Sequence, residues 1–323
     1  MRALVTGVGG FVGSHLAEFL LEQGVEVVGV DKPGRVEGVR ELVPGLTAAR
    51  EVDLMHPSQV QELISELQPQ RVFHLAAQAS VSRSWEDPVE TLTNNIVGQV
   101  HLFQAIIAAG ICPRILVIGS NEEYGFLRPD ELPVDEEHPL RPISPYAVSK
   151  VAQDLLGYQY FVSHGLHCVR MRPFNHIGPR QSQAFVASSL AKQVAEAEAG
   201  LREAVIRVGN LEVKRDFTDV RDVVRGYWLA LEKGEAGEVY NIGSGRAVSV
   251  KSILDFFLAH AQISLRVEQD SGLFRPSDIP ISYANCNKLR NQTGWEPAIP
   301  LEETLKDVLE YWRVRVAVEH GAS

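Results

Sequence analysis

The sequence predicts an α/β protein with a doubly wound parallel sheet and a smaller C-terminal α/β domain. Short β-branched runs alternate with longer amphipathic stretches up to about Arg172, a pattern typical of consecutive βαβ units. Beyond Arg172 this rhythm weakens, and segments bounded by Gly and Pro appear, such as "NHIGPRQ" and "FRPSDIP". The change indicates a second domain built over the carboxyl edge of the sheet, where ligand crevices form.

Each expected element is a short apolar run or a longer amphipathic stretch. The strands are expected at residues 3–6, 25–30, 71–76, 114–119 and 166–172. The helices are expected at residues 11–24, 57–68, 88–110 and 144–165. Three of these helical stretches end at Gly, the usual C-terminal stop. We expect residues 1–172 to form the first domain, part of 217–245 to pack back on it, 173–316 to form mainly the second domain, and 317–323 to be a tail.

The composition excludes several classes of protein. The chain has 323 residues, is 45% hydrophobic and 22% charged, and carries a net charge of −10, so neither a nucleic-acid nor a membrane partner is expected. No apolar run approaches the ~20 residues that span a bilayer, and the N-terminus turns glycine-rich too early for a signal peptide, so a cytoplasmic location is expected. Cys112, Cys168 and Cys286 lack metal-site or disulfide spacing, so we expect reduced core thiols and no metal.

A glycine-rich turn follows the first expected strand and opens the first expected helix. In "VTGVGGFVG" the spacing is Gly7-x-x-Gly10-x-x-Gly13. A tight turn, a close approach of backbone to a pyrophosphate and close helix–strand packing each require a residue without a side chain. The helix N-terminus adds free N–H groups and a partial positive charge. The turn therefore predicts a dinucleotide-binding site.

The end of the second expected strand bears on the choice of dinucleotide. Asp31 lies about 20 residues beyond the glycines, where a carboxylate accepts from the adenosine ribose hydroxyls and repels a 2′-phosphate. This favours NAD over NADP, although Lys32 or Arg35 could pair with such a phosphate. Asp53 could reach the adenine, and small residues in "HLAAQ" (residues 74–78) would lie beside the cofactor.

A tyrosine and a lysine stand four residues apart in "YAVSK", at the start of an expected helix. Tyr146 and Lys150 therefore project from one face, and an ammonium beside a phenol would lower the pKa of the phenol. Such a tyrosine exchanges a proton with a sugar hydroxyl near neutral pH. Ser120, at the end of the fourth expected strand, offers a hydroxyl that could polarise a carbonyl.

With these motifs the chain resembles the extended short-chain dehydrogenase/reductases that act on nucleotide sugars. The residues that carry the resemblance are "TGVGGFVG", "HLAAQ", "NNIVG", Ser120 and "YAVSK". In the second half, "RPFNHIGPRQSQAFV", "VGNLEVKRDFTDVRDVV", "YNIGSG" and "RPSDIP…TGWEP" resemble the GDP-4-keto-6-deoxy-D-mannose reductases. The resemblance implies a Rossmann-type NAD(P)-binding domain, a nucleotide-sugar-binding domain, and a cytoplasmic homodimer that pairs through the helices at 88–106 and 144–160.

The resemblance also implies roles for matching residues. Tyr146 would exchange the proton at the sugar O4, Lys150 would hold the nicotinamide ribose, and Ser120 would hydrogen-bond the same sugar oxygen. The cofactor-binding residues would be Gly7, Gly10, Phe11, Val12, Gly13, Asp31, Lys32, Asp53, Leu54, Leu75, Ala76, Ala77, Gln78, Asn95, Tyr146, Lys150 and Pro173. The substrate-binding residues would be Asn175, Lys192, Arg215, Arg275 and Asp278, with the two arginines on the diphosphate.

The loop "GSNEEYG" leaves the reaction open. In related 4,6-dehydratases a Glu after the Ser/Thr removes the C5 proton, and Glu122 stands at that place, whereas Glu123 is expected to point away and to be structural. The first interpretation is an NAD(P)H-dependent reductase that forms GDP-D-rhamnose. The alternatives are a GDP-mannose 4,6-dehydratase or nucleotide-sugar 4-epimerase with tightly bound NAD, and a non-catalytic NAD or nucleotide-sugar binding protein.

Overall fold

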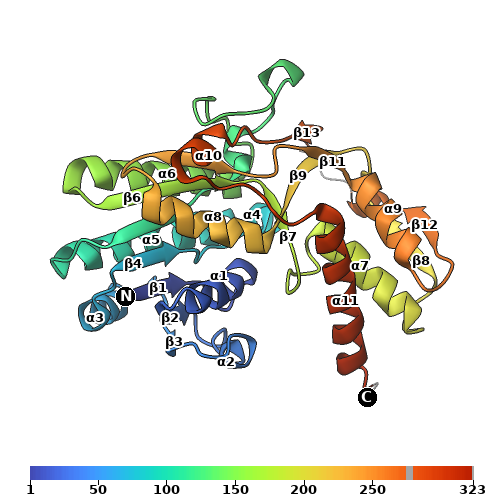
Figure 1. Ribbon diagram of the computed structural model, residues 1–323, viewed down its shortest axis with the longest axis horizontal. Helices are drawn as coiled ribbons and strands as arrows, with labels where there is room; N and C mark the ends of the chain where they lie inside the picture. Colours follow the sequence, from blue (N-terminus) through green and yellow to red (C-terminus); the bar gives the residue numbers. More distant parts are fainter. Residues whose placement is uncertain (274–278, 322–323) are drawn as a thin grey trace.

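The computed structural model describes residues 1–273 and 279–321. A large parallel sheet with helices on both faces forms one body, and α7, α9 and α11 form most of a second body beside it (Figure 1). The predicted fold class is confirmed. The residue bounds of the two domains stay a prediction.

The central sheet has seven strands, and all neighbouring pairs are parallel. In spatial order the strands are β10 (Val239–Ile242), β6 (His167–Pro173), β5 (Arg114–Ile118), β4 (Arg71–His74), β1 (Arg2–Thr6), β2 (Glu26–Asp31) and β3 (Ala48–Glu51). The order reverses between β1 and β4, where the chain passes from one half of the sheet to the other. A ligand crevice is expected at the carboxyl ends of these strands.

Side-chain alternation along the strands buries both faces of the sheet. On β1, Ala3 and Val5 join a core cluster that includes residues of α1 (Phe11–Glu22) and α8 (Val220–Lys233). Leu4 points to the opposite face and joins a cluster that includes residues of α3, α5 and α6. The remaining helices of this body are α2 (Val39–Leu42), α3 (Pro57–Leu67), α4 (Val81–Glu86), α5 (Pro88–Ala108), α6 (Pro145–His164) and α10 (Asn287–Thr293).

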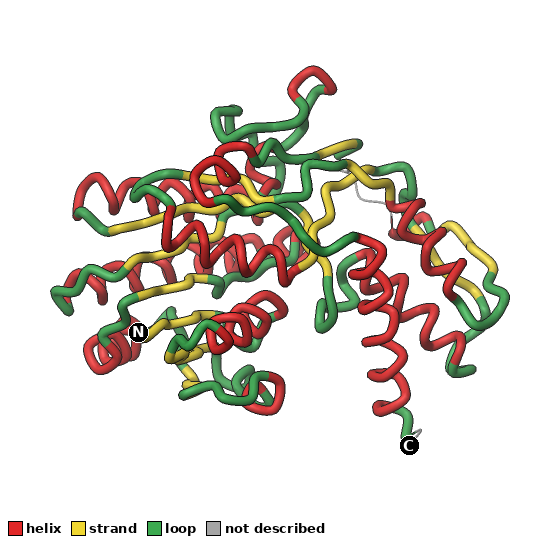
Figure 2. The backbone as a smooth tube through the Cα atoms, in the orientation of Figure 1, coloured by secondary structure: helices red, strands yellow, loops and turns green. Residues whose placement is uncertain are grey.

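A long loop joins β5 to α6 and carries the 3-10 turns η1 (Asn121–Tyr124) and η2 (Pro129–Glu131). The part around η2 stands away from the sheet at the top of the view (Figure 2). The other end of the loop, η1, follows β5 directly. The residues of "GSNEEYG" therefore lie at the carboxyl edge of the sheet.

The second body is built from helices and short strands. Its helices α7 (Val186–Glu198), α9 (Val250–His260) and α11 (Leu301–Glu319) share a separate core. Its short strands and 3-10 turn are β7 (Asn175–Ile177), β8 (Val205–Val208), β9 (Lys214–Asp219), β11 (Ala247–Ser249), β12 (Arg266–Gln269), β13 (Ile281–Ser282) and η3 (Ser271–Leu273). Strand β9 is central, because it pairs with β7, β11 and β13.

Helix α1 also holds the loop that follows β7. The Arg180 guanidinium donates to both carboxylate oxygens of Glu18, at 2.9 and 2.5 Å, and lies against the His15 ring. Burial and the Arg180 charge lower the pKa of His15 to about 4, so this ring stays neutral. Phe11, at the start of α1, stacks on His176 of β7 with ring centroids 6.0 Å apart. These contacts hold α1 against β7 and the loop that follows it.

One expectation about the cysteines is wrong. Cys168 and Cys286 are buried, but Cys112 is exposed, because it lies in the short turn between α5 and β5. Within residues 1–273 and 279–321, no helix combines the length and apolarity needed to cross a membrane. Among the same described residues, no group of three or more His, Cys, Asp or Glu is arranged so that it could hold a metal ion.

Candidate active site

The glycine turn after β1 forms a cradle that side chains would fill. Gly7 has a φ of +76°, and a Cβ on it would come within 2.9 Å of the Ala76 nitrogen. A Cβ on Gly13 would come within 2.1 Å of the Gly7 carbonyl oxygen. The N-cap of α1 is Gly10, so no N-cap side chain accepts a hydrogen bond from the first N–H groups of the helix. The turn and helix start therefore have the geometry that a dinucleotide pyrophosphate requires.

Asp31 closes one side of the cradle. Its Oδ2 accepts from the Gly9 N–H at 3.0 Å, and its Oδ1 accepts from the Lys32 N–H at 2.8 Å. Burial raises the pKa of Asp31, against these hydrogen bonds and the charges of Arg35 and Lys32. Gly9 thus ties the glycine turn to the end of β2, a contact that the glycine spacing alone does not predict.

The end of β4 and the start of the following loop form the next wall. Ala76 donates its N–H to Thr6 Oγ1 at 3.1 Å, which holds this segment beside β1. Asn95, on α5, makes two hydrogen bonds to the Gln78 backbone. Its Oδ1 accepts from the Gln78 N–H at 2.7 Å, and its Nδ2 donates to the Gln78 carbonyl oxygen at 3.1 Å. Asn95 is fully buried, so it positions Gln78. Asp53 accepts from the Met55 N–H at 3.0 Å in the turn after β3.

Ser120 is held by its own loop. The Ser120 N–H donates to Glu123 Oε1 at 2.7 Å, and Ser120 Oγ accepts from the Glu122 N–H at 3.2 Å. Glu123 is fully buried against Arg172, as expected for a structural residue. Burial and the charge of Asp154 raise the pKa of Glu123. Glu123 thus orients the Ser120 backbone, and the charge of Glu122 acts on Tyr146.

Tyr146 and Lys150 lie on the first turns of α6, both more than nine-tenths buried. Tyr146 makes a hydrogen bond with Ser120, which brings the predicted Ser, Tyr and Lys to the carboxyl edge of β5. The Lys150 ammonium donates to the Ile118 carbonyl oxygen at 2.8 Å.

The expected lowering of the Tyr146 pKa is wrong for this structure. Burial raises the pKa of Tyr146, the hydrogen bond from Ser120 opposes the rise, and the charges of Glu122 and Glu123 add to it. Lys150 directs two N–H groups at other acceptors, and burial lowers its own pKa to about 8. The phenol is therefore protonated at neutral pH.

The substrate-side residues are placed as follows. Asn175 lies at the start of β7, and its Oδ1 is buried without a hydrogen-bond partner among the described residues. Arg215, on β9, donates to the Ile279 carbonyl oxygen. Arg275 and Asp278 lie outside the described residues. Pro173 ends β6 and is buried.

Lys192 lines a hollow of about 310 Å³ on the second body. The lining residues are Gln183, Ser189, Lys192, Gln193, Glu196, Arg202, Arg207, Asp270 and Leu273. Lys192 donates to Gln183 Oε1 at 2.5 Å, and its ammonium lies 5.3 Å from the Trp312 ring centroid. Charged side chains of both signs line this hollow.

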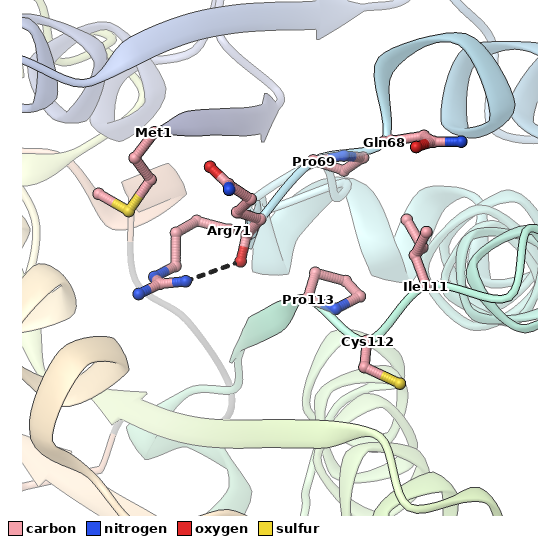
Figure 3. A pocket seen from close by; sticks show the side chains of 8 residues that line it. Met1, Gln68, Pro69, Arg71, Ile111, Cys112 and Pro113 are labelled. Atoms are coloured by element: carbon pink, nitrogen blue, oxygen red, sulfur yellow. Dashed lines mark hydrogen bonds between the residues drawn. The ribbon is translucent and has the colours of Figure 1, made fainter.

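A larger hollow of about 590 Å³ lies at the opposite edge of the sheet (Figure 3). It is lined by Met1, Gln68, Pro69, Gln70, Arg71, Ile111, Cys112 and Pro113. These residues precede or begin β1, β4 and β5, so the hollow is at the amino ends of the strands. Arg71 is already paired with both carboxylate oxygens of Glu232. These lining residues include no acid and base that could exchange a proton with a substrate. The candidate active site is therefore the one at the carboxyl edge of the sheet.

A dinucleotide cradle joined to a buried Ser–Tyr–Lys set defines an extended short-chain dehydrogenase/reductase. Residues 4–308 match the family model described as GDP-mannose 4,6 dehydratase. The chain belongs to this family of nucleotide-sugar-modifying enzymes.

Individual relatives span nearly the whole chain. A GDP-6-deoxy-D-mannose reductase of Pseudomonas aeruginosa is 36% identical over 98% of this chain and 99% of its own length. A solved structure, described as RMD from Pseudomonas aeruginosa complexed with NADPH, is 35% identical with a TM-score of 0.86 and covers 97% of this chain and 99% of its own. A Thermus thermophilus UDP-glucose 4-epimerase in complex with NAD is 32% identical, also with a TM-score of 0.86, over 97% and 99%.

Proposed function

We propose that this enzyme reduces the C4 keto group of GDP-4-keto-6-deoxy-D-mannose to give GDP-D-rhamnose. The observation that carries the proposal is the protonated Tyr146 phenol, hydrogen-bonded to Ser120 at the carboxyl edge of β5. The similarity to the Pseudomonas aeruginosa reductase supports this substrate.

A protonated Tyr146 suits the reductive direction, in which the substrate oxygen takes up a proton. A ketone that accepts a hydride becomes an alkoxide and needs a proton from a neutral acid. Tyr146 is a neutral acid at neutral pH, because burial raises the pKa of its phenol, and it would give its proton to O4 as the alkoxide forms. Ser120 would donate a hydrogen bond to the same oxygen while negative charge develops on it.

A reduced nicotinamide, when bound, supplies the hydride. The glycine cradle would hold its pyrophosphate, Asp31 the adenosine ribose, and Lys150 the nicotinamide ribose. We expect NADH to be favoured because the Asp31 carboxylate would repel a 2′-phosphate, and NADPH would also be accepted, in line with the NADPH-bound relative.

The nucleotide end of the substrate would lie against the second body. Asn175, whose buried Oδ1 has no hydrogen-bond partner among the described residues, would face the sugar, and Arg215 of β9 would contact the diphosphate. Arg275 and Asp278 remain proposed contacts to the diphosphate and the nucleotide. Lys192 would reach the base from its hollow.

A dehydratase is the second candidate, because the charge of Glu122 acts on Tyr146 and the matching family model is that of the dehydratases. In that case Glu122 would take the C5 proton and the cofactor would be reduced and reoxidised within one turnover.

We also propose a homodimer formed through α5 and α6. Val148, Leu155 and Val162 recur at seven-residue spacing on α6 with exposed fractions of 44, 51 and 63%. Trp85 and Val89 expose further apolar surface at α4 and the start of α5. An exposed apolar stripe of this kind suits a helical interface.

The test compares two substrates. The purified protein is incubated with GDP-4-keto-6-deoxy-D-mannose or GDP-mannose, each with NADH and NADPH, and the products are identified by mass spectrometry and NMR. Stoichiometric cofactor oxidation with the ketosugar and GDP-D-rhamnose as product are expected. Ketosugar formed from GDP-mannose without net cofactor change would replace the proposal with the dehydratase.

A further inference from the structure

We propose that Gln153 is a positioning residue that fixes the Lys150 ammonium with a neutral oxygen. Gln153 follows Lys150 by three residues on α6 and is 1% exposed. Its Oε1 accepts from Lys150 Nζ at 2.8 Å. Because Lys150 is the cofactor-facing lysine only under the proposed function, the catalytic meaning of this contact rests on that function.

Two acceptors set the rotation of the ammonium. Lys150 Nζ has three N–H groups, and the described residues provide Ile118 O and Gln153 Oε1, each at 2.8 Å. One acceptor comes from the end of β5 and the other from α6. With two N–H groups directed in this way, the third has a single direction, and a flexible four-carbon side chain becomes a fixed donor.

The Gln153 amide cannot turn over without breaking further contacts. Its Nε2 donates to Gln99 Oε1 at 3.0 Å and lies 3.4 Å from His74 Nε2, and Gln99 Nε2 donates back to Gln153 O at 2.8 Å. With an amide N–H facing His74 Nε2, the ring hydrogen of His74 is on Nδ1, 2.9 Å from Thr6 Oγ1. These side chains are all buried. The amide oxygen is therefore committed to Lys150.

The Gln153 Oε1 that accepts from Lys150 carries no net charge, and a charge at so buried a place would have a large effect on the pKa of Lys150. Glu123, from η1, is the acid that raises the pKa of Lys150, and burial outweighs it and lowers that pKa to about 8. On the other sides, His74 is neutral because burial lowers its pKa to about 3, and Asp154 of α6 is paired with Arg170 and Arg172. A carboxylate in place of the amide would add a full negative charge in contact with the ammonium.

The test measures the titration of Lys150 directly. The protein is labelled with [ε-13C]lysine, and Lys150→Met identifies the Lys150 signal. In Gln153→Glu the midpoint is expected to rise by about one to three pH units, the usual effect of an opposite charge in contact. In Gln153→Leu it is expected to fall, because the charged form loses an acceptor. Gln23→Glu adds the same charge at an exposed position at the C-terminal end of α1, by the amino edge of the sheet, and is expected to leave the midpoint unchanged.

Activity provides a second measurement. The pH limit of kcat/KM for ketosugar reduction is expected to move in the same directions as the NMR midpoint, and the KM for NADH is expected to rise in Gln153→Leu. Midpoints that stay unchanged in both Gln153 variants, or that move in the same direction, would overturn the proposal. Because the NMR titration uses no substrate, shifted midpoints in a protein that fails to reduce ketosugar would reject the reductase function and keep the Gln153–Lys150 contact.

Discussion

Gly13→Ala tests the glycine cradle most directly. The new Cβ would lie 2.1 Å from the Gly7 carbonyl oxygen and 2.9 Å from the Val8 Cα, both main-chain atoms. The first distance is about 1.3 Å shorter than the 3.4 Å at which ordinary contact begins. Alanine favours a helix over glycine by about 1 kcal/mol, but overpacking against backbone costs about 1–3 kcal/mol. The net loss of stability is therefore small, and the main effect is a displaced turn.

We expect Gly13→Ala to fold and to lose at least about tenfold in NADH affinity, which corresponds to about 1.4 kcal/mol. The assay is a fluorescence titration of NADH, with thermal unfolding as the check on folding. Gly157→Ala, in α6 and outside the cradle, is the control, since its Cβ would meet only the Arg170 side chain, at 3.2 Å, and the Val117 side chain, at 3.4 Å. Equal NADH affinities for the two variants and the unaltered protein would refute the idea that this turn cradles the pyrophosphate.

Four further predictions concern single side chains. The unaltered protein is expected to bind NADH more tightly than NADPH, by about 1 kcal/mol or more, and Asp31→Asn is expected to narrow that difference; equal affinities in the unaltered protein would contradict it. Tyr146→Phe is expected to bind cofactor and lose about 100-fold or more in turnover, and near-normal turnover would remove Tyr146 from the mechanism. Glu122→Gln is expected to keep most ketosugar reduction while Ser120→Ala loses more; collapse of Glu122→Gln, with solvent deuterium entering the C6 methyl from GDP-mannose, would favour the dehydratase. Because Lys150 is charged below its pKa of about 8, kcat/KM is expected to fall as the pH rises through that value, and a flat profile to pH 10 would contradict this role.

Residues that act through local spacing could be predicted from the sequence. Gly7, Gly10 and Gly13 stand in one turn, and Tyr146 and Lys150 stand one helical turn apart, so their relative placement follows from backbone geometry. The alternation of runs likewise predicted the strands that became β1, β2, β4, β5 and β6.

Residues that act through tertiary contacts could not be predicted. Gln153 approaches His74, which lies 79 positions earlier in the chain, and no local pattern marks that pair. The Tyr146 pKa was predicted in the wrong direction because sequence spacing shows a lysine nearby but shows neither the burial nor the acceptors that occupy the lysine. Gln153 did carry one signal, since it follows Lys150 by three residues and so shares its helix face.

The fastening of the loop after β7 to α1 has a thermodynamic consequence. Phe11 and the Glu18–Arg180 pair connect α1, which would receive the pyrophosphate, to β7 and the loop after it, which would lie on the substrate side. If the first ligand to bind orders this shared element, it lowers the conformational cost for the second. Reciprocity then requires that the factor by which NADH tightens GDP binding equals the factor by which GDP tightens NADH binding. The Arg180–Glu18 contact could therefore couple the binding of NADH to the binding of GDP, although the two ligands would share no contact residue.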